Sequence, residues 1–242
     1  MPSKEVVAQL APTGVLRAGI NLSNMLLVTG KSANGDPEGV SPDMAAAVAA
    51  SLGVPIKYVK FQTPGELADA AGANQWDIGN IGAEPQRAAE IEFTAAYCEI
   101  EASYLVWANS KLKTVTDVDA PGVRIVTAGR AAYGLWLERN IKSATLVRTD
   151  TVPGAAEQFA RDKVEAMAGL RPRLLTDVKE IAGTRILDGK FMSVQQAVGT
   201  PKRNQVGASW LRGFVEEAKA SGLVARLIAK HKVQGLSVAP QA

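Results

Sequence analysis

The chain has 242 residues, enough for one large domain or for two lobes, with 47% hydrophobic and 21% charged residues. Its 27 basic and 24 acidic residues give a net charge of +3, and no basic run carries interleaved aromatic residues, so we expect no nucleic-acid partner. Cys98 is the only cysteine and His231 the only histidine, which excludes disulfides, Cys/His metal centres and catalytic triads built on a cleft histidine. We therefore expect no bound metal and no cofactor.

No apolar run is long enough to cross a bilayer, and the first residues, MPSKEVVAQLAPTG, lack the apolar core of a signal peptide. Two localisations are compatible with this pattern. If a leader was removed, the protein belongs in the periplasm; if there was none, it stays in the cytoplasm.

The first part of the chain alternates strands and helices. After a short polar arm we expect, in order, a strand at 15–20, a polar loop, a helix at 41–52, a strand at 56–61, a helix opened by Thr63 and a strand at 76–82. This order implies parallel strands joined by crossover helices, which form a first α/β lobe. Asp43, in the first turn of the helix at 41–52, is interpreted as structural.

The segment 76–97, WDIGNIGAEPQRAAEIEFTAAY, predicts a buried strand, a glycine-containing turn, one helical turn and a second apolar strand. Pro85 suits the first helical position, so the free N–H groups of this turn and the Arg87 guanidinium could converge on one anion. The alternative is that Arg87 pairs with Glu90 or Glu92 on a solvated face.

The rest of the chain repeats the same order. A long strand at 101–108 leaves the first lobe, a second series of strands and helices follows, and a strand at 194–202 returns. Two helices, at 206–220 and 223–232, complete the chain. Cys98 is interpreted as a small core residue. His231 is interpreted as a residue that caps the last helix or faces solvent there.

Seven residues of the central segment carry a resemblance to a known family. The segment resembles the family-3 solute-binding proteins, the periplasmic amino-acid-binding components of ABC transporters. It matches their motif at Asp77, Pro85, Arg87, Ile91, Phe93, Thr94 and Tyr97. The resemblance implies an α/β chain with the type II periplasmic-binding-protein fold, in which each lobe is a mixed sheet flanked by helices and two hinge strands join the lobes. Lobe 1 would comprise residues 1–106 and 197–242, and lobe 2 residues 107–196.

The resemblance also implies a function: capture of a small carboxylate or amino-acid-like ligand in the inter-lobe cleft for ABC-type uptake, by a monomer that delivers it to a membrane permease. Two alternatives stay open. One is a dehydratase-like enzyme on the same scaffold, for which Glu84 is the acid that we would nominate. The other is a sensory ligand-binding domain.

The expected ligand-binding residues follow from the family's motifs. In the family, the residue matched by Arg87 grips the ligand carboxylate, and a helix N-terminus in lobe 2 assists it. The positions that we expect to contact the ligand are Arg87, Gly82, Asn80, Asn24, Arg130, Ala131 and Arg171. Arg130 could instead point to solvent, and Arg171 could cap the helix that follows it. Arg171 stands near the position where the family places an acid for the ligand's α-ammonium group, so we expect an anion without a paired amino group.

Overall fold

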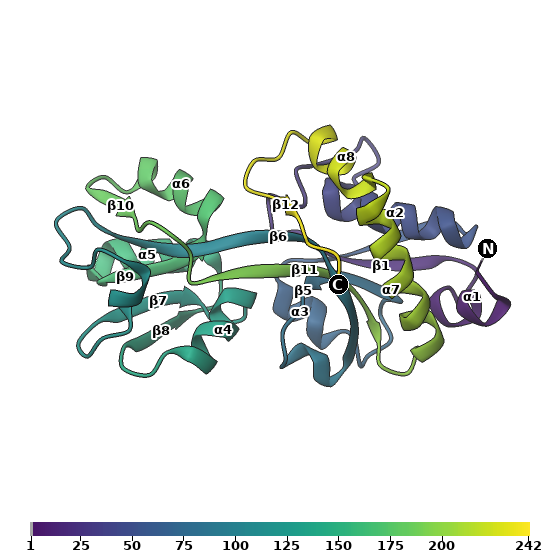
Figure 1. Cartoon of the computed structure of the whole chain (residues 1–242), viewed down its shortest axis with the longest axis horizontal. Helices are drawn as coiled ribbons and strands as arrows, with labels where there is room; N and C mark the ends of the chain where they lie inside the picture. The colour runs from purple at the N-terminus through teal and green to yellow at the C-terminus, as the bar shows by residue number, and fades with distance from the viewer. Residues whose placement is uncertain (1) are drawn as a thin grey trace. The chain divides into compact units, whose positions relative to one another are not determined.

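The alternation of strands and helices that the sequence predicts is present in both parts of the chain (Figure 1). The computed structural model describes residues 2–242. The chain divides into two units: unit 1 comprises Met1–Glu99 with Gln195–Ala242, and unit 2 comprises Ile100–Val194. We expected the divisions after residues 106 and 196. Strands β6 (Ile91–Trp107) and β11 (Met192–Pro201) each run from one unit into the other.

Unit 1 contains a five-stranded section of the sheet in the order β4-β1-β5-β11-β6. Strands β4, β1 and β5 are parallel, whereas β11 is antiparallel to β5, and β12 is antiparallel to β6. Besides β6 and β11, the elements of unit 1 are α1 (Lys4–Leu10), β1 (Leu16–Asn21), β2 (Gly30–Lys31), β3 (Pro37–Glu38), α2 (Val40–Leu52), β4 (Ile56–Phe61), α3 (Pro64–Asp69), β5 (Ile78–Gly82), η1 (Arg87–Ala89), α7 (Gln205–Ala220), α8 (Leu223–Lys230) and β12 (Ser237–Val238).

Unit 2 continues the ladder in the order β6-β9-β7-β8. Strands β9, β7 and β8 are parallel to one another and β6 is antiparallel to β9, so the unit is a mixed sheet like the first. Its remaining elements are η2 (Val115–Val118), β7 (Arg124–Ala128), α4 (Ala132–Asn140), β8 (Thr145–Thr149), α5 (Val152–Asp162), β9 (Ala166–Leu170), α6 (Arg171–Glu180) and β10 (Thr184–Ile186). The hydrogen-bonded ladder is continuous because β6 and β11 belong to both units.

Local sequence signals explain where the helices begin and end. The Thr63 hydroxyl caps α3 by accepting a hydrogen bond from the Glu66 N–H, at 3.2 Å. Gly53 ends α2 in the left-handed conformation, with φ 71°. The predicted helix opening at Thr63 and the predicted helix end at Gly53 are therefore confirmed.

The prediction of a polar arm at the N-terminus was wrong. Residues 4–10 form α1, which the Ser3 side chain caps. Val6 and Leu10 are buried. A Cβ added at Gly207 of α7 would lie only 2.7 Å from the Leu10 side chain, so α1 packs closely against α7 at this point. The helix therefore depends on contacts with the far end of the chain, which the local pattern of residues 4–10 does not reveal.

The core of unit 1 is built around Trp76, which is fully buried and donates its indole N–H to the Leu67 carbonyl at 3.0 Å. Two glycines on neighbouring strands make room for its ring: a Cβ at Gly19 or at Gly79 would lie 3.2 Å from Trp76 atoms. The ring can therefore pack directly on the backbone of β1 and β5.

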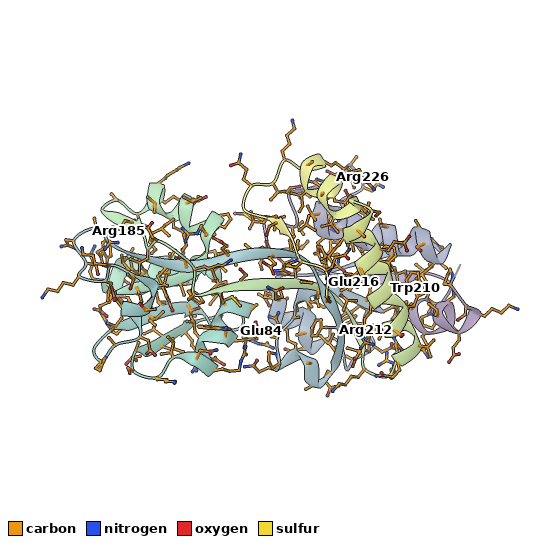
Figure 2. The ribbon with its side chains drawn as sticks, viewed as in Figure 1. Glu84, Arg185, Trp210, Arg212, Glu216 and Arg226 are labelled. Carbon is orange, nitrogen blue, oxygen red and sulfur yellow. The ribbon has the colours of Figure 1, made fainter. Side chains whose placement is uncertain are left out.

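The C-terminal segment is fastened to unit 1 by a buried lysine. The Lys219 ammonium, whose side chain is 1% exposed, donates to the Pro240 carbonyl at 2.6 Å and pairs with Glu216 at 2.8 Å. Figure 2 labels Glu216, with Trp210 and Arg212, along α7. Strand β12 then pairs with Cys98 and Glu99 of β6. Within residues 2–242, no helix is both long and apolar enough to span a bilayer.

Two glycines of α7 provide a matched test of this packing. A Cβ at Gly213 would meet no atom within 4 Å, whereas one at Gly207 would overlap Leu10. We expect Gly213→Ala to stabilise the protein by about 0.5–1 kcal/mol, because alanine loses less backbone entropy in a helix. We expect Gly207→Ala to destabilise it by about 1–3 kcal/mol through overpacking. Urea unfolding measures both changes, and equal effects of the two variants would contradict the placement of α1 against α7.

Candidate functional site

Arg87 is buried at the carboxyl end of β5. Its residue is 6% exposed, and its Nη1 donates to the Gly82 carbonyl at 2.7 Å. The backbone N–H groups of Arg87 and Ala88 both donate to the Glu84 carbonyl at 3.0 Å, which shapes the turn. Arg87 therefore does not lie on a solvated face, and Glu92 pairs with Arg212. The predicted strand, turn and helical turn are all present, and they place Gly82 in direct contact with Arg87.

Asp77, which also matches the family motif, has a structural role. Its carboxylate accepts hydrogen bonds from the backbone N–H of Arg17 at 2.8 Å and from the Arg17 guanidinium at 2.6 Å. The hydrogen bond to Asp77 raises the pKa of the Arg17 guanidinium, against the opposing effect of burial. This pair joins the start of β5 to β1, so it fixes the strand that carries the turn before Arg87.

Asn80 faces α2 and is 2% exposed, and its amide nitrogen donates to the Ser41 carbonyl at 2.9 Å. This bond joins β5 to the first turn of α2. Its amide oxygen is buried and has no hydrogen-bond partner among residues 2–242. The placement supports a structural role, and the contact of Asn80 with a ligand stays a prediction.

Asn24 lies in the loop that follows β1. Its side-chain oxygen accepts from the Leu26 N–H at 3.2 Å, and its carbonyl accepts from the N–H groups of Leu27 and Val28. These bonds make Asn24 the organiser of a turn. The neighbouring Met25 is 63% exposed and was missed by the sequence analysis. Exposure of a large apolar side chain cannot be inferred from its type alone.

Arg130 and Ala131 form the turn between β7 and α4 in unit 2. Arg130 is exposed, and Ala131 is the N-cap of α4, which no side-chain oxygen caps. A Cβ at Gly134 would lie 2.3 Å from the Ala128 carbonyl oxygen, so this glycine lets α4 begin close to the end of β7. The helix N-terminus presents backbone N–H groups and the positive end of the helix dipole.

Arg171 is the first residue of α6, directly after β9. Its Nε donates to the Glu101 carboxylate at 3.2 Å, and its Nη2 donates to the Leu187 carbonyl at 3.4 Å and to the Gly189 carbonyl. The sequence analysis found no acid near this point. Glu101 was missed because it comes from β6, and the only signal for it was the antiparallel pairing of β6 with β9.

Asp43 and His231 lie together in unit 1, although they are far apart in the sequence. The Asp43 carboxylate is 2.8 Å from the Lys230 ammonium and 2.6 Å from His231 Nε2. Partial burial alone would raise the pKa of Asp43, but the hydrogen bonds from Lys230 and His231 outweigh it and hold that pKa below its usual value. The structural interpretation of Asp43 is confirmed, since it joins α2 to the end of α8.

The single cysteine of the chain lies in the core of the protein. Cys98 is fully buried in β6, and burial raises the pKa of its thiol, so the sulfur stays protonated. Its interpretation as a core residue is confirmed. Residues 2–242 contain no group of three or more His, Cys, Asp or Glu side chains placed to hold a metal ion.

The fold and the motif together define a class of protein. Each unit has a mixed sheet flanked by helices, strands β6 and β11 run from one unit into the other, and a buried arginine follows β5. These are the features of the type II periplasmic-binding-protein fold. The model of the bacterial extracellular solute-binding proteins, family 3, matches residues 18–234, so the chain belongs to that family.

Solved structures agree on the fold. A solute receptor for L-cysteine of Neisseria gonorrhoeae is 18% identical, with a TM-score of 0.76 over 97% of this chain and 99% of that one. A binding component of an ABC transporter from Wolinella succinogenes, complexed with lysine, is 21% identical, with a TM-score of 0.73 over 90% and 95%. An ancestral amino-acid-binding protein, described as a precursor of cyclohexadienyl dehydratase, is 20% identical, with a TM-score of 0.73 over 93% and 98%. No curated protein sequence matches significantly.

The pKa shift of Asp43 generates a pH test. A carboxyl whose pKa is lowered on folding stabilises the protein above its unfolded pKa, and this stabilisation is lost as the pH falls through the folded value. We expect Asp43→Asn to lower the free energy of unfolding by about 1 kcal/mol at about pH 7. We expect a smaller difference at about pH 3.

Urea unfolding at the two pH values makes this measurement. Asp150→Asn is the control, because Asp150 is an exposed acid in unit 2. An Asp43→Asn effect that is the same at both pH values would contradict a role for the carboxylate charge.

Proposed function

We propose that this protein captures a small carboxylate or amino-acid-like ligand for ABC-type uptake, working in the periplasm as a monomer beside a membrane permease. Family membership supports the general role, because the family consists of extracellular solute-binding proteins. The observation that carries the finer proposal is Arg87, a buried cation at the carboxyl end of a parallel strand, where ligands of open α/β sheets bind.

The environment of Arg87 suits a carboxylate ligand. The bond from Nη1 to the Gly82 carbonyl orients the guanidinium, so less side-chain entropy is lost when a ligand binds. A planar guanidinium can bind a carboxylate through two parallel hydrogen bonds. Oriented in advance and charged at any physiological pH, Arg87 would act as the principal ligand-binding residue of unit 1.

For unit 2 we propose contacts from the start of α4 and the start of α6. The uncapped N-terminus of α4 at Ala131 and the exposed Arg130 both favour a negative charge. Arg171 adds a further cation at the carboxyl end of β9. Closure of the two units on the ligand, which the family resemblance implies, stays a prediction.

We further propose that the protein binds its ligand without converting it. Cysteine is a common nucleophile and histidine a common general base, and this chain has one of each. The Cys98 thiol is buried, and His231 is hydrogen-bonded to Asp43. Chromatography of a bound ligand before and after incubation tests this point, since loss of the ligand over time would support the dehydratase-like alternative.

The decisive variant is Arg87→Ala. We expect it to abolish ligand binding, measured by isothermal titration calorimetry, and Arg87→Lys to lose much of the affinity because an ammonium keeps the charge without the two parallel donors. The matched control is Arg212→Ala, which removes an arginine of the same unit that pairs with Glu92. Unchanged affinity in a folded Arg87→Ala protein would refute the assignment.

The ligand class is tested by a thermal-shift screen. We expect carboxylates without an amino group to raise the melting temperature of the wild-type protein, because a ligand that binds only the folded state stabilises it. The matched set is the corresponding amino acids. Shifts with the amino acids and none with the deaminated compounds would contradict the proposed anionic class and leave the solute-binding role intact.

A further inference from the structure

A short segment after α8 pairs with β6 at the place where that strand leaves unit 1. The segment comprises β12 and the two residues that follow it, 237–240, and we call it the β12 strap. Strand β12 pairs with Cys98 and Glu99 in an antiparallel register, and the Ala239 N–H donates to the Tyr97 carbonyl at 3.1 Å. Unit 1 ends at Glu99. The strap therefore covers the last residues of β6 that belong to unit 1.

The other strand that runs between the units, β11, is anchored in a comparable way. Its pairing with β5 begins at Gln196, and the Gln195 carbonyl accepts from the Ala83 N–H at 2.8 Å. Gln195 is also the first residue of β11 that belongs to unit 1. Strand β5 thus holds β11 up to the boundary of the unit, and the β12 strap does the same for β6.

Beyond this boundary β6 changes its partner. Its pairing with β9 of unit 2 begins at Ala102. Ile100 and Glu101 lie between the two registers, so neither β12 nor β9 pairs with them. At the boundary itself, the Gln195 side-chain nitrogen donates to the Glu99 carboxylate at 2.9 Å and joins the two crossing strands. The change of partner in β6 therefore coincides with the division between the units.

The strap needs contacts beyond its own pairing, because a strand of two residues is marginal by itself. One such contact is the buried Lys219 of α7, whose ammonium donates to the Pro240 carbonyl at 2.6 Å. Ala239, between β12 and this anchor, is 6% exposed. The strap is therefore fixed to β6 at one end and to α7 at the other, both within unit 1.

We propose that the β12 strap sets the position of the hinge in β6. Hinges are a few residues that absorb a change in φ and ψ. By holding residues 97–99 in unit 1, the strap confines this change to Ile100 and Glu101. Release of the strap lets the flexible stretch extend back into unit 1 and widens the range of movement between the units. The use of this hinge for closure on a ligand rests on the proposed function.

The register of the strap provides a matched pair of variants. In an antiparallel ladder the N–H groups of alternate residues face the partner strand. The Ala239 N–H faces β6, so the Ser237 N–H also faces it and the Val238 N–H points away. Ser237→Pro therefore removes a donor of the ladder, whereas Val238→Pro removes an N–H that the ladder does not use. Both side chains are exposed, so neither substitution leaves a cavity.

Hydrogen exchange of the ligand-free full chain tests the hold of the strap on β6, with mass spectrometry of peptides that cover residues 97–101. We expect Ser237→Pro to accelerate exchange at Glu99 on the order of tenfold, because one ladder hydrogen bond is lost. Val238→Pro should leave the rate unchanged. Lys219→Met, which frees the other end of the strap, should act in the same direction as Ser237→Pro. Unchanged exchange in both Ser237→Pro and Lys219→Met would overturn the proposal.

Spin-label distance measurements test the hinge itself. Labels introduced by Lys57→Cys in β4 and Lys179→Cys in α6 occupy exposed positions, one in each unit, and the buried Cys98 stays unlabelled. We expect Ser237→Pro to broaden the distribution of distances between the labels and Val238→Pro to leave its width unchanged. Faster exchange at Glu99 without broadening, or equal broadening by the two variants, would show that the strap does not set the hinge.

Failure of this inference is distinguishable from failure of the proposed function, because neither measurement uses a ligand. If no carboxylate binds to the protein, the proposed function fails and the effect of the strap on β6 stands. If the strap variants behave like the wild type, the hinge assignment fails and the binding test on Arg87 is unaffected. A circular-dichroism spectrum that matches the wild type confirms that each variant is folded.

Discussion

Parallel pairing is the constraint on which the candidate site depends. Parallel strands need a crossover after each strand, so all their carboxyl ends meet at one edge of the sheet and the loops that leave them lie together. In unit 1 this rule applies to β4, β1 and β5, and the turn after β5 brings Arg87 to that edge. In unit 2 it applies to β8, β7 and β9, and places the starts of α4 and α6 at the equivalent edge.

The partners of the buried charged side chains show which of these residues have a structural role. Asp77 is satisfied by Arg17 and Lys219 by Pro240, and Asp177 lies 2.7 Å from Arg173. Burial raises the pKa of Asp177, although the hydrogen bond from Arg173 opposes this shift. The Asp77 and Lys219 contacts each join two segments of the fold, whereas Arg173 and Asp177 lie one turn apart in α6. Arg87 differs in position, because it follows the carboxyl end of a parallel strand.

Arg87 in unit 1 and Arg171 in unit 2 are held in position by different kinds of contact. Unit 1 uses local geometry, because Gly82, Glu84 and Arg87 lie within one turn and bond to one another's backbone. Unit 2 uses long-range pairing, because Glu101 meets Arg171 through sheet register and Lys190 through a turn held by Ser103. A single substitution in the turn of unit 1 acts locally, whereas the contact of Glu101 with Arg171 depends on the correct pairing of β6 and β9.

What the sequence determined by itself was local. The caps at Thr63 and Gly53, the alternating elements and the strand–turn that carries Arg87 all follow from residues a few positions apart, for which periodicity and turn chemistry are sufficient. Only the tertiary structure decided that residues 4–10 form a helix against α7, that Asn80 bonds to α2, and that Glu101 supplies an acid beside Arg171. Each of these depends on contacts between residues far apart in the chain, and such contacts are set by packing and strand register, which a single sequence does not display.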